Sequence, residues 1–401
     1  MKTVAIICEY NPFHLGHAYH IESIKRQFGD DTAIIAIMSG NFVERGDLAV
    51  LGKFDRAEMA VRSGASLVLE LPFPYSMASA EYFAFAAVEI ADKLGCVDFL
   101  SFGSECGDIS RLEAAADRVS SPAFDSAVEQ LSKSKELSSL GYAALRTQAY
   151  RSLYGDEDTS LLSSPNNILA VEYLKALARL SSRIEPHTIR RTGTDLDASG
   201  DTVPFAGATH IRSLIVEDKI SEALASIPDT AHDTLLRALH DGRMPVRLEK
   251  LSSAILASLR LEKSCEAAEC GGGLYEYLKK KARQSTDLAD FFHKSATKKF
   301  TDARIRRATL FSYFGVTPAM LHDRVRYTQV LAMDGKGQAV LHHIRKHAGI
   351  SILTKPADTD KLPPEAKAQA EASYRADSVY TLAYPKPQAA DVFLRTSPYR
   401  K

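Results

Sequence analysis

The first hundred residues alternate short, almost uninterrupted apolar runs with stretches of helical periodicity, and this alternation limits the fold more than any other feature. Four runs are rich in β-branched or aromatic residues: 3–8, 33–38, 66–71 and 97–103. Runs that are apolar throughout predict strands covered on both faces. Because helical patterns separate them, we expect right-handed crossovers and a doubly wound, parallel α/β sheet of the Rossmann type.

The rest of the chain is mostly helical in pattern. Residues 108–182 predict helices, one of which starts at Ser164 as N-cap with Pro165 in its first turn. We expect helices again from about residue 229 to residue 313. The other expected elements are a strand at 184–190, a loop at 193–207, a helix at 209–216 and a final strand-helix-strand pattern at 326–332, 338–348 and 350–354.

Composition fits a globular protein, and the length fits two or three domains. The chain has 401 residues, 50 Lys+Arg against 50 Asp+Glu, and 45% hydrophobic residues. These values exclude a disordered chain and a fibrous one. We place the main boundary near residue 230, between an α/β domain (1–230) and a mainly helical domain (231–401).

The chain carries no pattern for export or membrane insertion. Its opening apolar run is too short for a signal peptide, and no apolar stretch approaches the length of a membrane span. Five cysteines in no disulfide framework fit a reducing compartment. We therefore expect a soluble cytoplasmic protein, with no membrane association, and we infer no protein partner.

The segment E-Y-N-P-F-H-L-G-H directly follows the first predicted strand and opens a helix. In an α/β protein this corner binds phosphate, because unpaired helix N–H groups point at the anion. It is not a Walker loop. His14 and His17 flank Gly16 instead, and two imidazoles can donate hydrogen bonds to phosphate oxygens as charge develops at phosphorus.

Two other interpretations of these histidines remain open. His14, His17 and His20 recur at intervals of three, which could suit zinc, but His14 precedes the glycine and so should lie outside the helix. We therefore predict no metal site. The histidines could also simply cap and pack the start of a helix.

Cations and small residues elsewhere could complete a site at the same edge of the sheet. Lys53 and Arg56 follow the second strand and could reach a phosphate, or could belong to a solvated helix face. Gly103 ends the fourth strand and could let a nucleotide lie against the backbone, or could be part of a turn.

The H-x-G-H motif resembles that of the nucleotidyltransferase and class I synthetase superfamily, whose members attack the α-phosphate of ATP. A second signature of that superfamily resembles A-G-A-T-H-I-R at residues 206–212, where Thr209 and Arg212 match. Gly207 and Ala208 replace its usual serines, which puts the hydroxyl contacts there in doubt. Asn166, Asn167, Arg190 and Arg191 could face the adenosine, or could be caps and surface residues.

Five ordered blocks narrow the resemblance to the tRNA(Met) cytidine acetate ligase family. They are E-Y-N-P-F-H-L-G-H, S-G-N-F-V-E-R-G-D-L-A, L-S-F-G-S-E-C-G-D, S-P-N-N-I-L-A-V-E-Y and F-T-D-A-R-I-R-R, between residues 9 and 307. The resemblance implies that ATP and acetate form acetyl-adenylate. The acetyl group then passes to the wobble cytidine of elongator tRNA(Met), giving N4-acetylcytidine, AMP and pyrophosphate.

The resemblance also implies residue roles. It implies that His14 and His17 stabilise the phosphates. To these we add Lys53, because of its position after the second strand, as a third predicted catalytic residue in an ATP-binding domain formed by residues 1–230. Mg²⁺ is expected with the ATP. The predicted ATP contacts are Ile7, Cys8, Glu9, Tyr10, Asn11, Pro12, Phe13, His14, Leu15, Gly16, His17, Ala18, Tyr19, His20, Gly103, Asn166, Asn167, Arg190, Arg191, Thr209 and Arg212.

A cluster of cations predicts the RNA surface. Residues 279–326 hold twelve Lys or Arg against four Asp, although the whole chain is neutral. Clustered cations bind RNA phosphates. Phe291, Phe292, Phe300 and Tyr313 could stack on bases or could be core residues. The predicted RNA-binding residues are Lys279, Lys280, Lys281, Lys298, Lys299, Arg304, Arg306 and Arg307.

Two other functions fit the H-x-G-H motif. A small-molecule adenylyltransferase would join ATP to a phosphorylated acceptor, but it would leave the basic region unexplained. A nucleotide-dependent RNA-binding protein without catalytic activity is the other alternative.

Overall fold

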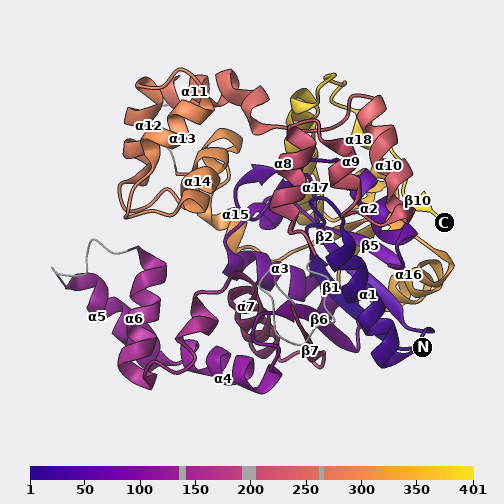
Figure 1. Cartoon of the computed structure of the whole chain (residues 1–401), viewed down its shortest axis with the longest axis horizontal. Helices are drawn as coiled ribbons and strands as arrows, with labels where there is room; N and C mark the ends of the chain where they lie inside the picture. The colour runs from indigo at the N-terminus through magenta and orange to yellow at the C-terminus, as the bar shows by residue number, and fades with distance from the viewer. Residues whose placement is uncertain (135–140, 192–204, 262–265) are drawn as a thin grey trace.

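A single sheet forms the centre of the computed structural model, which describes residues 1–134, 141–191, 205–261 and 266–401. Over these residues the sheet has eight strands in the order β10-β8-β5-β2-β1-β6-β7, with β9 paired to β8 (Figure 1). Five neighbouring strands of this sheet, β5, β2, β1, β6 and β7, are mutually parallel. This arrangement confirms the predicted doubly wound α/β fold. They are β1 (Thr3–Cys8), β2 (Ala33–Ser39), β5 (Leu67–Leu71), β6 (Phe99–Ser104) and β7 (Glu185–Arg190).

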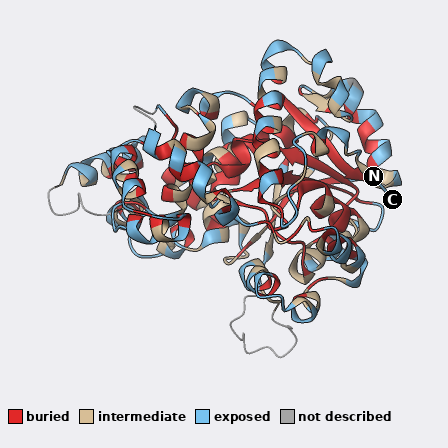
Figure 2. Cartoon of the chain, turned by 90° about the horizontal axis from the view of Figure 1, so that it is seen from above, coloured by how far each residue is buried: buried red, intermediate tan, exposed pale blue. Residues whose placement is uncertain are grey.

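Successive residues of the central strands face two separate cores. In β1, Val4 and Ile6 belong to one core and Ala5 to the other, as the alternation of side chains in a strand requires. Figure 2 shows the sheet as a buried band beneath helices whose outer faces are exposed. Helices α1 (Leu15–Phe28) and α2 (Lys53–Arg62) complete the first core; α3 (Ala80–Lys93), α7 (Pro165–Leu180) and α16 (Gly335–His347) complete the second.

The winding of the sheet reverses beside β1. Strands β2 and β5 extend from one side of it, and β6 and β7 from the other. The chain segments that leave the two neighbouring strands at such a point diverge, and a crevice forms between them at the carboxyl ends of the strands. Doubly wound proteins bind their ligands in this crevice. The H-x-G-H segment leaves β1 at this crevice.

Two groups of helices project from the same side of the sheet (Figure 1). Both groups occur where helical periodicity predicted them. The first contains α4 (Ile109–Val119), α5 (Pro122–Lys133) and α6 (Tyr142–Tyr154); the second, here called the helical lobe, contains α11 (Ser252–Leu261), α12 (Leu274–Arg283), α13 (Leu288–Ser295) and α14 (Asp302–Phe314). The two groups meet where Gly141, the N-cap of α6 in the first group, lies against the segment between α13 and α14 in the second. A Cβ at Gly141 would lie 3.6 Å from the carbonyl oxygens of Lys298 and Lys299.

The sheet continues past the predicted boundary at residue 230. Strand β8 (Tyr327–Met333) pairs antiparallel with β5, and β10 (Tyr399–Arg400) pairs with β8. The predicted strand-helix-strand pattern is confirmed by β8, α16 and β9 (Ser351–Leu353). The description of 231–401 as one mainly helical region is therefore too simple, because its last part completes the N-terminal sheet. A boundary near 230 between separately folding units stays a prediction.

The remaining elements connect these parts. Helix α8 (Ala208–Val216) confirms the helix predicted at 209–216, whereas residues 192–204 of the predicted loop lie outside the described residues. No helix in the described ranges is long and apolar enough to cross a membrane. The others are β3 (Phe42–Val43), β4 (Asp47–Leu48), α9 (Ile220–Leu224), α10 (Asp229–His240), α15 (Pro318–His322), α17 (Pro364–Tyr380), α18 (Val392–Arg395), η1 (Tyr75–Met77), η2 (Thr159–Leu162), η3 (Leu248–Leu251), η4 (Pro356–Lys361) and η5 (Thr381–Ala383).

Candidate active site

Two stacked imidazoles form the start of α1. His14 is the N-cap, and its Nδ1 accepts a hydrogen bond from the Gly16 N–H at 3.1 Å. The backbone N–H of His14 donates in turn to Nδ1 of His17 at 3.3 Å. Because each Nδ1 accepts a hydrogen bond, a neutral ring must carry its proton on Nε2. Both histidines can therefore offer an Nε2–H donor.

The surroundings keep both rings neutral. Burial, together with the charges of Arg191 and Arg212, lowers the pKa of His14 to about 4. Burial and the neighbouring His14 ring also lower the pKa of His17 well below its ordinary value. Neutral N–H donors stabilise developing negative charge without first having to lose or gain a proton.

Gly16 permits this arrangement. A Cβ at Gly16 would lie 2.9 Å from Cε1 and 3.1 Å from Nδ1 of His14, which is too close for an unshifted ring. Glycine at this position therefore makes room for the His14 ring.

Buried side chains just before His14 pack beneath the turn that carries the H-x-G-H motif. Tyr10 and Phe13 are fully buried, and their rings lie 4.7 and 5.5 Å from that of His17. The Asn11 side chain accepts a hydrogen bond from Val50 N–H at 2.8 Å. These side chains hold the motif in place, so any contact with a ligand comes from their backbone. The same buried stretch includes Pro12, while Ile7, Cys8 and Glu9 are partly exposed at the end of β1.

Arg212 joins this turn to the start of α8. Its guanidinium donates to the Asn11 carbonyl at 2.8 Å and to the Thr209 hydroxyl at 3.1 Å. The structure thus brings Thr209 and Arg212 to the H-x-G-H motif across about 200 residues of sequence. Helix α8 has Gly207 as its N-cap, without a side-chain hydrogen bond.

Arg191 lies near the histidines, since its charge helps to lower the pKa of both His14 and His17. Its N–H donates to the Ser104 carbonyl at 2.8 Å, and its side chain crosses Gly103, where a Cβ would come within 2.9 Å of Arg191 Cγ. Gly103 therefore accommodates the arginine. Arg190 lies nearby against Gly107, where a Cβ would come within 2.6 Å of Arg190 Cβ.

Asn166 and Asn167 lie in the first turn of α7, where both bind the carboxylate of Glu105. Glu105 accepts hydrogen bonds from the Asn166 side chain at 2.7 Å and from the Asn167 N–H at 2.8 Å. Ser164 is the N-cap as predicted, but its side chain makes no capping bond. Glu105 supplies the negative charge at this helix N-terminus instead.

His20 points into the sheet. Its Nε2 lies 2.9 Å from the Ser101 hydroxyl, which lies 3.0 Å from Nδ1 of His187. Burial lowers the pKa of His20 to about 3. These contacts assign His20 to holding α1 against β6. The sequence provided no signal for Ser101 or His187, because the partners are about 80 residues apart.

The structure does not support the prediction that Lys53 is catalytic. Its side chain is fully buried, and Nζ lies 2.8 Å from Glu70 and 2.7 Å from Asp377. Burial alone would lower the pKa of Lys53, but these two carboxylates raise it above its ordinary value. An ammonium held between two buried carboxylates cannot reach a phosphate at the crevice.

Arg56 is also buried and does not reach a ligand. Its guanidinium donates to the backbone carbonyls of Glu9, Ser39, Gly40 and Leu51. It thereby ties the carboxyl ends of β1 and β2 together. Neither Lys53 nor Arg56 belongs to a solvated helix face.

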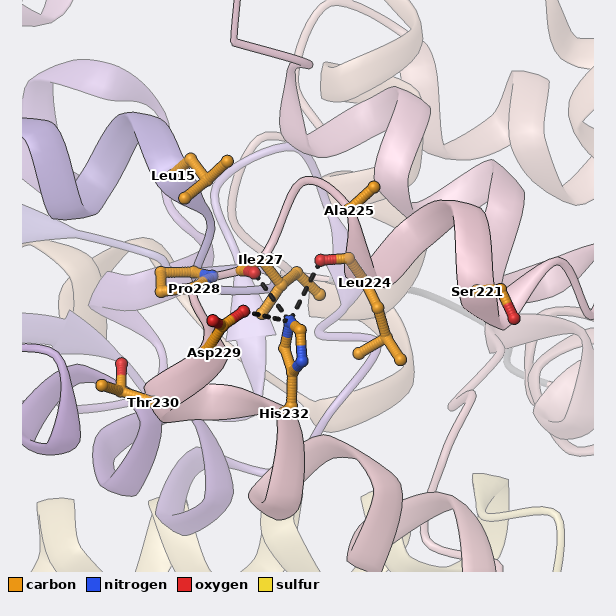
Figure 3. Close-up of a pocket in the computed structure, with 9 residues that line it drawn as sticks. All are labelled: Leu15, Ser221, Leu224, Ala225, Ile227, Pro228, Asp229, Thr230 and His232. Carbon is orange, nitrogen blue, oxygen red and sulfur yellow. Dashed lines mark hydrogen bonds and ion pairs between the residues drawn. The ribbon is translucent and has the colours of Figure 1, made fainter.

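A surface pocket of about 560 Å³ lies beside the start of α1 (Figure 3). Figure 3 shows His232 bonded to the carbonyls of Leu224 and Ile227, at 3.1 and 2.8 Å. The turn between those residues accepts a hydrogen bond from the Leu15 N–H through Ser226. His232 therefore supports the start of α1 from outside the crevice.

The remaining residues of the predicted ATP segment lie along α1. Leu15 borders the pocket in Figure 3, and Ala18 packs against the core beneath. Tyr19 is 39% exposed, and its ring lies 5.7 Å from that of Phe205, just before α8.

The basic region forms the exposed part of the helical lobe, with one exception. Arg307 is 7% exposed and bonded to Glu269 and Glu44, so its assignment to the RNA surface is wrong. Arg306 packs on Phe292, whereas Phe291 and Phe300 are buried, which assigns those two rings to the core. The partly or fully exposed cations are Lys279, Lys280, Lys281, Lys298, Lys299, Arg304 and Arg306.

A family model and full-length relatives match almost the whole chain. The family model described as HIGH Nucleotidyl Transferase matches residues 1–392. The tRNA(Met) cytidine acetate ligase of Caldanaerobacter subterraneus subsp. tengcongensis is 38% identical over 398 residues, which are 96% of each chain. That of Acetivibrio thermocellus is 34% identical over 403 residues, again 96% of each.

Solved structures agree. The crystal structure of Thermotoga maritima TmcAL bound with alpha-thio ATP has a TM-score of 0.91 and 31% identity, and the match covers 100% of both chains. The apo form of the same protein also has a TM-score of 0.91.

Proposed function

This chain belongs to the HIGH nucleotidyl transferase family and, within it, to the tRNA(Met) cytidine acetate ligases, and we propose that it is an ATP-dependent ligase that attaches acetate to a cytidine of tRNA(Met). The observation that carries the chemistry is the pair of neutral imidazoles at the start of α1, each with Nδ1 accepting a backbone hydrogen bond. Such a pair suits a reaction at phosphorus.

In the first step, a carboxylate oxygen of acetate attacks the α-phosphorus of ATP. The bond from that phosphorus to the bridging oxygen breaks, so pyrophosphate leaves and acetyl-adenylate remains. Nε2–H of His14 and of His17 donate to the α-phosphate oxygens, where negative charge increases. Arg191 and Arg212 supply positive charge beside them, since both lower the pKa of His14.

In the second step, the exocyclic amine of the wobble cytidine attacks the acetyl carbonyl. The bond between that carbon and the phosphate oxygen breaks, the amine gives up a proton to solvent, and AMP leaves. The product is N4-acetylcytidine in elongator tRNA(Met). Acetate requires this activation because its free carboxylate is a poor acyl donor.

ATP is the co-substrate, and Thr209 with the N-terminus of α8 suits its β- and γ-phosphates. Besides His14 and His17, we retain the other residues of 7–20 and Gly103 as candidate ATP contacts, and Asn166, Asn167 and Arg190 as candidates for the adenosine side. We also expect Mg²⁺ to accompany the triphosphate. The described part of the chain contains no group of three His, Cys, Asp or Glu that could hold a metal. We therefore assign no protein ligands to Mg²⁺ and no step to it.

The seven partly or fully exposed cations of the helical lobe form the proposed RNA surface. Clustered charge of this kind binds phosphates without reading sequence. We expect the enzyme to act in the cytoplasm, where tRNA and ATP are available.

One assay tests the proposal. Purified protein is incubated with ¹⁴C-acetate, ATP and total tRNA, and we expect label in tRNA that depends on ATP. Digestion of the product should yield labelled N4-acetylcytidine. Unlabelled tRNA, together with pyrophosphate release from ATP and a small phosphorylated acceptor, would contradict it and favour an adenylyltransferase.

A further inference from the structure

Arg307 connects the helical lobe to the hairpin formed by β3 and β4. Its Nε donates to both carboxylate oxygens of Glu269 at 2.9 Å, on the lobe side. Its Nη1 donates to the carbonyl of Glu44 at 3.2 Å and lies 3.4 Å from the Glu44 carboxylate, on the hairpin side. A guanidinium shared in this way fixes both distance and orientation, because its donors lie in one plane.

The hairpin lies directly against the backbone of α14. Gly46 has a φ of +72°, and a Cβ there would be 2.5 Å from Arg307 N and 2.8 Å from Arg306 C. Arg306 also lies 3.7 Å from Asp47. Near the far end of α14, Phe314 meets Phe42 edge to face, with 5.2 Å between ring centroids.

The other side of the hairpin contacts the H-x-G-H turn. The Glu44 N–H donates to the Glu9 carboxylate at 2.8 Å, and Val50 N–H, just after β4, donates to the Asn11 side chain at 2.8 Å. Asn11 also accepts from Arg212 through its carbonyl. The short segment from β3 to β4 thus touches both the ATP crevice and the helix that carries Arg304 and Arg306.

Acetyl transfer requires these two parts to be held in register. The cytidine amine must come within about 3.5 Å of the acetyl carbon, and an error of about 1 Å can slow such a reaction a hundredfold. RNA held on the lobe reaches that distance only if the lobe keeps a fixed position relative to the crevice. Arg307 is the buried cation at this junction.

We propose that Arg307 is a positioning residue for acetyl transfer, which acts through Glu44 and the β3–β4 hairpin to hold the RNA-binding lobe in register with the ATP crevice. This inference rests on the proposed function. It makes Arg307 necessary for the second step and not for acetate activation or RNA affinity.

The test measures three quantities in the full chain carrying Arg307→Lys: acetate-dependent ATP–pyrophosphate exchange, affinity for an elongator tRNA(Met) transcript by filter binding, and the single-turnover rate of acetyl transfer at saturating tRNA. Lysine keeps the charge but loses the planar donors. We expect exchange and affinity within about twofold of wild type and transfer about tenfold to a hundredfold slower. Lys355→Gln, which removes an exposed cation outside the RNA surface, should leave all three quantities unchanged.

Glu44→Gln provides a second, milder variant, since its backbone N–H can still bind Glu9. It should show the same selective loss of transfer even if the lysine variant is unstable. Weaker tRNA binding with normal saturated transfer in both variants would return Arg307 to the RNA surface and overturn the proposal. Equal loss of all three quantities in Glu44→Gln would also overturn it, because the junction would then be merely structural. If wild type itself transfers no acetyl group to tRNA, the proposed function fails instead.

Discussion

The ring of His17 stacks on that of His14 with 3.7 Å between centroids, while its Nδ1 accepts the His14 backbone N–H. Each ring therefore restricts the other, and both direct Nε2 away from the backbone of the turn. This relationship links the two histidines of the motif into one unit.

Replacing His17 with alanine should abolish a donor to the α-phosphate. We expect acetate-dependent ATP–pyrophosphate exchange to fall by about a hundredfold or more, since removing one such donor typically costs 10²–10³ in rate. Affinity for tRNA should stay unchanged. His342→Ala, which alters an exposed histidine of α16, is the matched control. Parallel loss of exchange and tRNA affinity in His17→Ala would mean that the residue is structural.

The low pKa of His14 predicts a pH dependence of stability. The value is about 4 in the folded protein and 6.5 in the unfolded chain. Below pH 6.5 the unfolded chain therefore binds a proton that the native protein does not, and the native state loses stability until about pH 4. Asparagine can cap the helix without titrating. Relative to His14→Asn, wild type should lose up to about 1.4 kcal/mol per pH unit over that range. Urea denaturation at several pH values measures this, and parallel profiles would contradict it.

Lys53→Met should destabilise the fold. The variant leaves Glu70 and Asp377 buried beside each other without their cation, which typically costs about 3–5 kcal/mol. Urea denaturation measures the loss, and Lys298→Met, at an exposed lysine, should change stability little. A Lys53→Met protein of normal stability but without pyrophosphate exchange would restore the catalytic assignment.

A comparison of Gly46→Ala with Gly315→Ala should separate the effect of packing on stability from the effect of backbone strain. Gly46 and Gly315 have similar positive φ values, +72° and +67°, but a Cβ at Gly315 meets nothing within 4 Å. Both alanine variants carry the strain, whereas only the Gly46 variant forces α14 away from the hairpin. We expect the free energy of unfolding to fall about 1–3 kcal/mol further in Gly46→Ala. Equal losses would mean that the contact with Arg307 can relax without cost.

The RNA surface can be tested through the dependence of binding on salt. Changing Lys298 and Lys299 to glutamate should weaken tRNA binding, and the slope of log K against log salt should shrink by about one per lost phosphate contact. Lys355→Glu, at an exposed lysine outside this surface, is the control. An unchanged slope in the double variant would place the RNA elsewhere.

Much of the fold was predictable because its signals are local. A strand buried on both faces must be apolar throughout, so β1, β2, β5 and β6 were visible as apolar runs. Strand β7 is polar and only partly buried, and its signal was weaker. The H-x-G-H motif was recognisable because its residues are neighbours in sequence and its position after β1 is fixed by the crossover. Strands β8 and β10 were harder to place, since nothing in a strand's own sequence says which edge it will join.

The amino-acid sequence by itself determined the alternation of strands and helices, the phosphate-binding corner and the family resemblance, all of which depend on short-range patterns. Only the tertiary structure decided which charges reach solvent. Lys53 and Arg307 look like surface cations in sequence, but their carboxylate partners lie from 17 to 324 residues away. Pairing over such separations is set by packing, because a buried charge is tolerated only where the fold supplies its counterion.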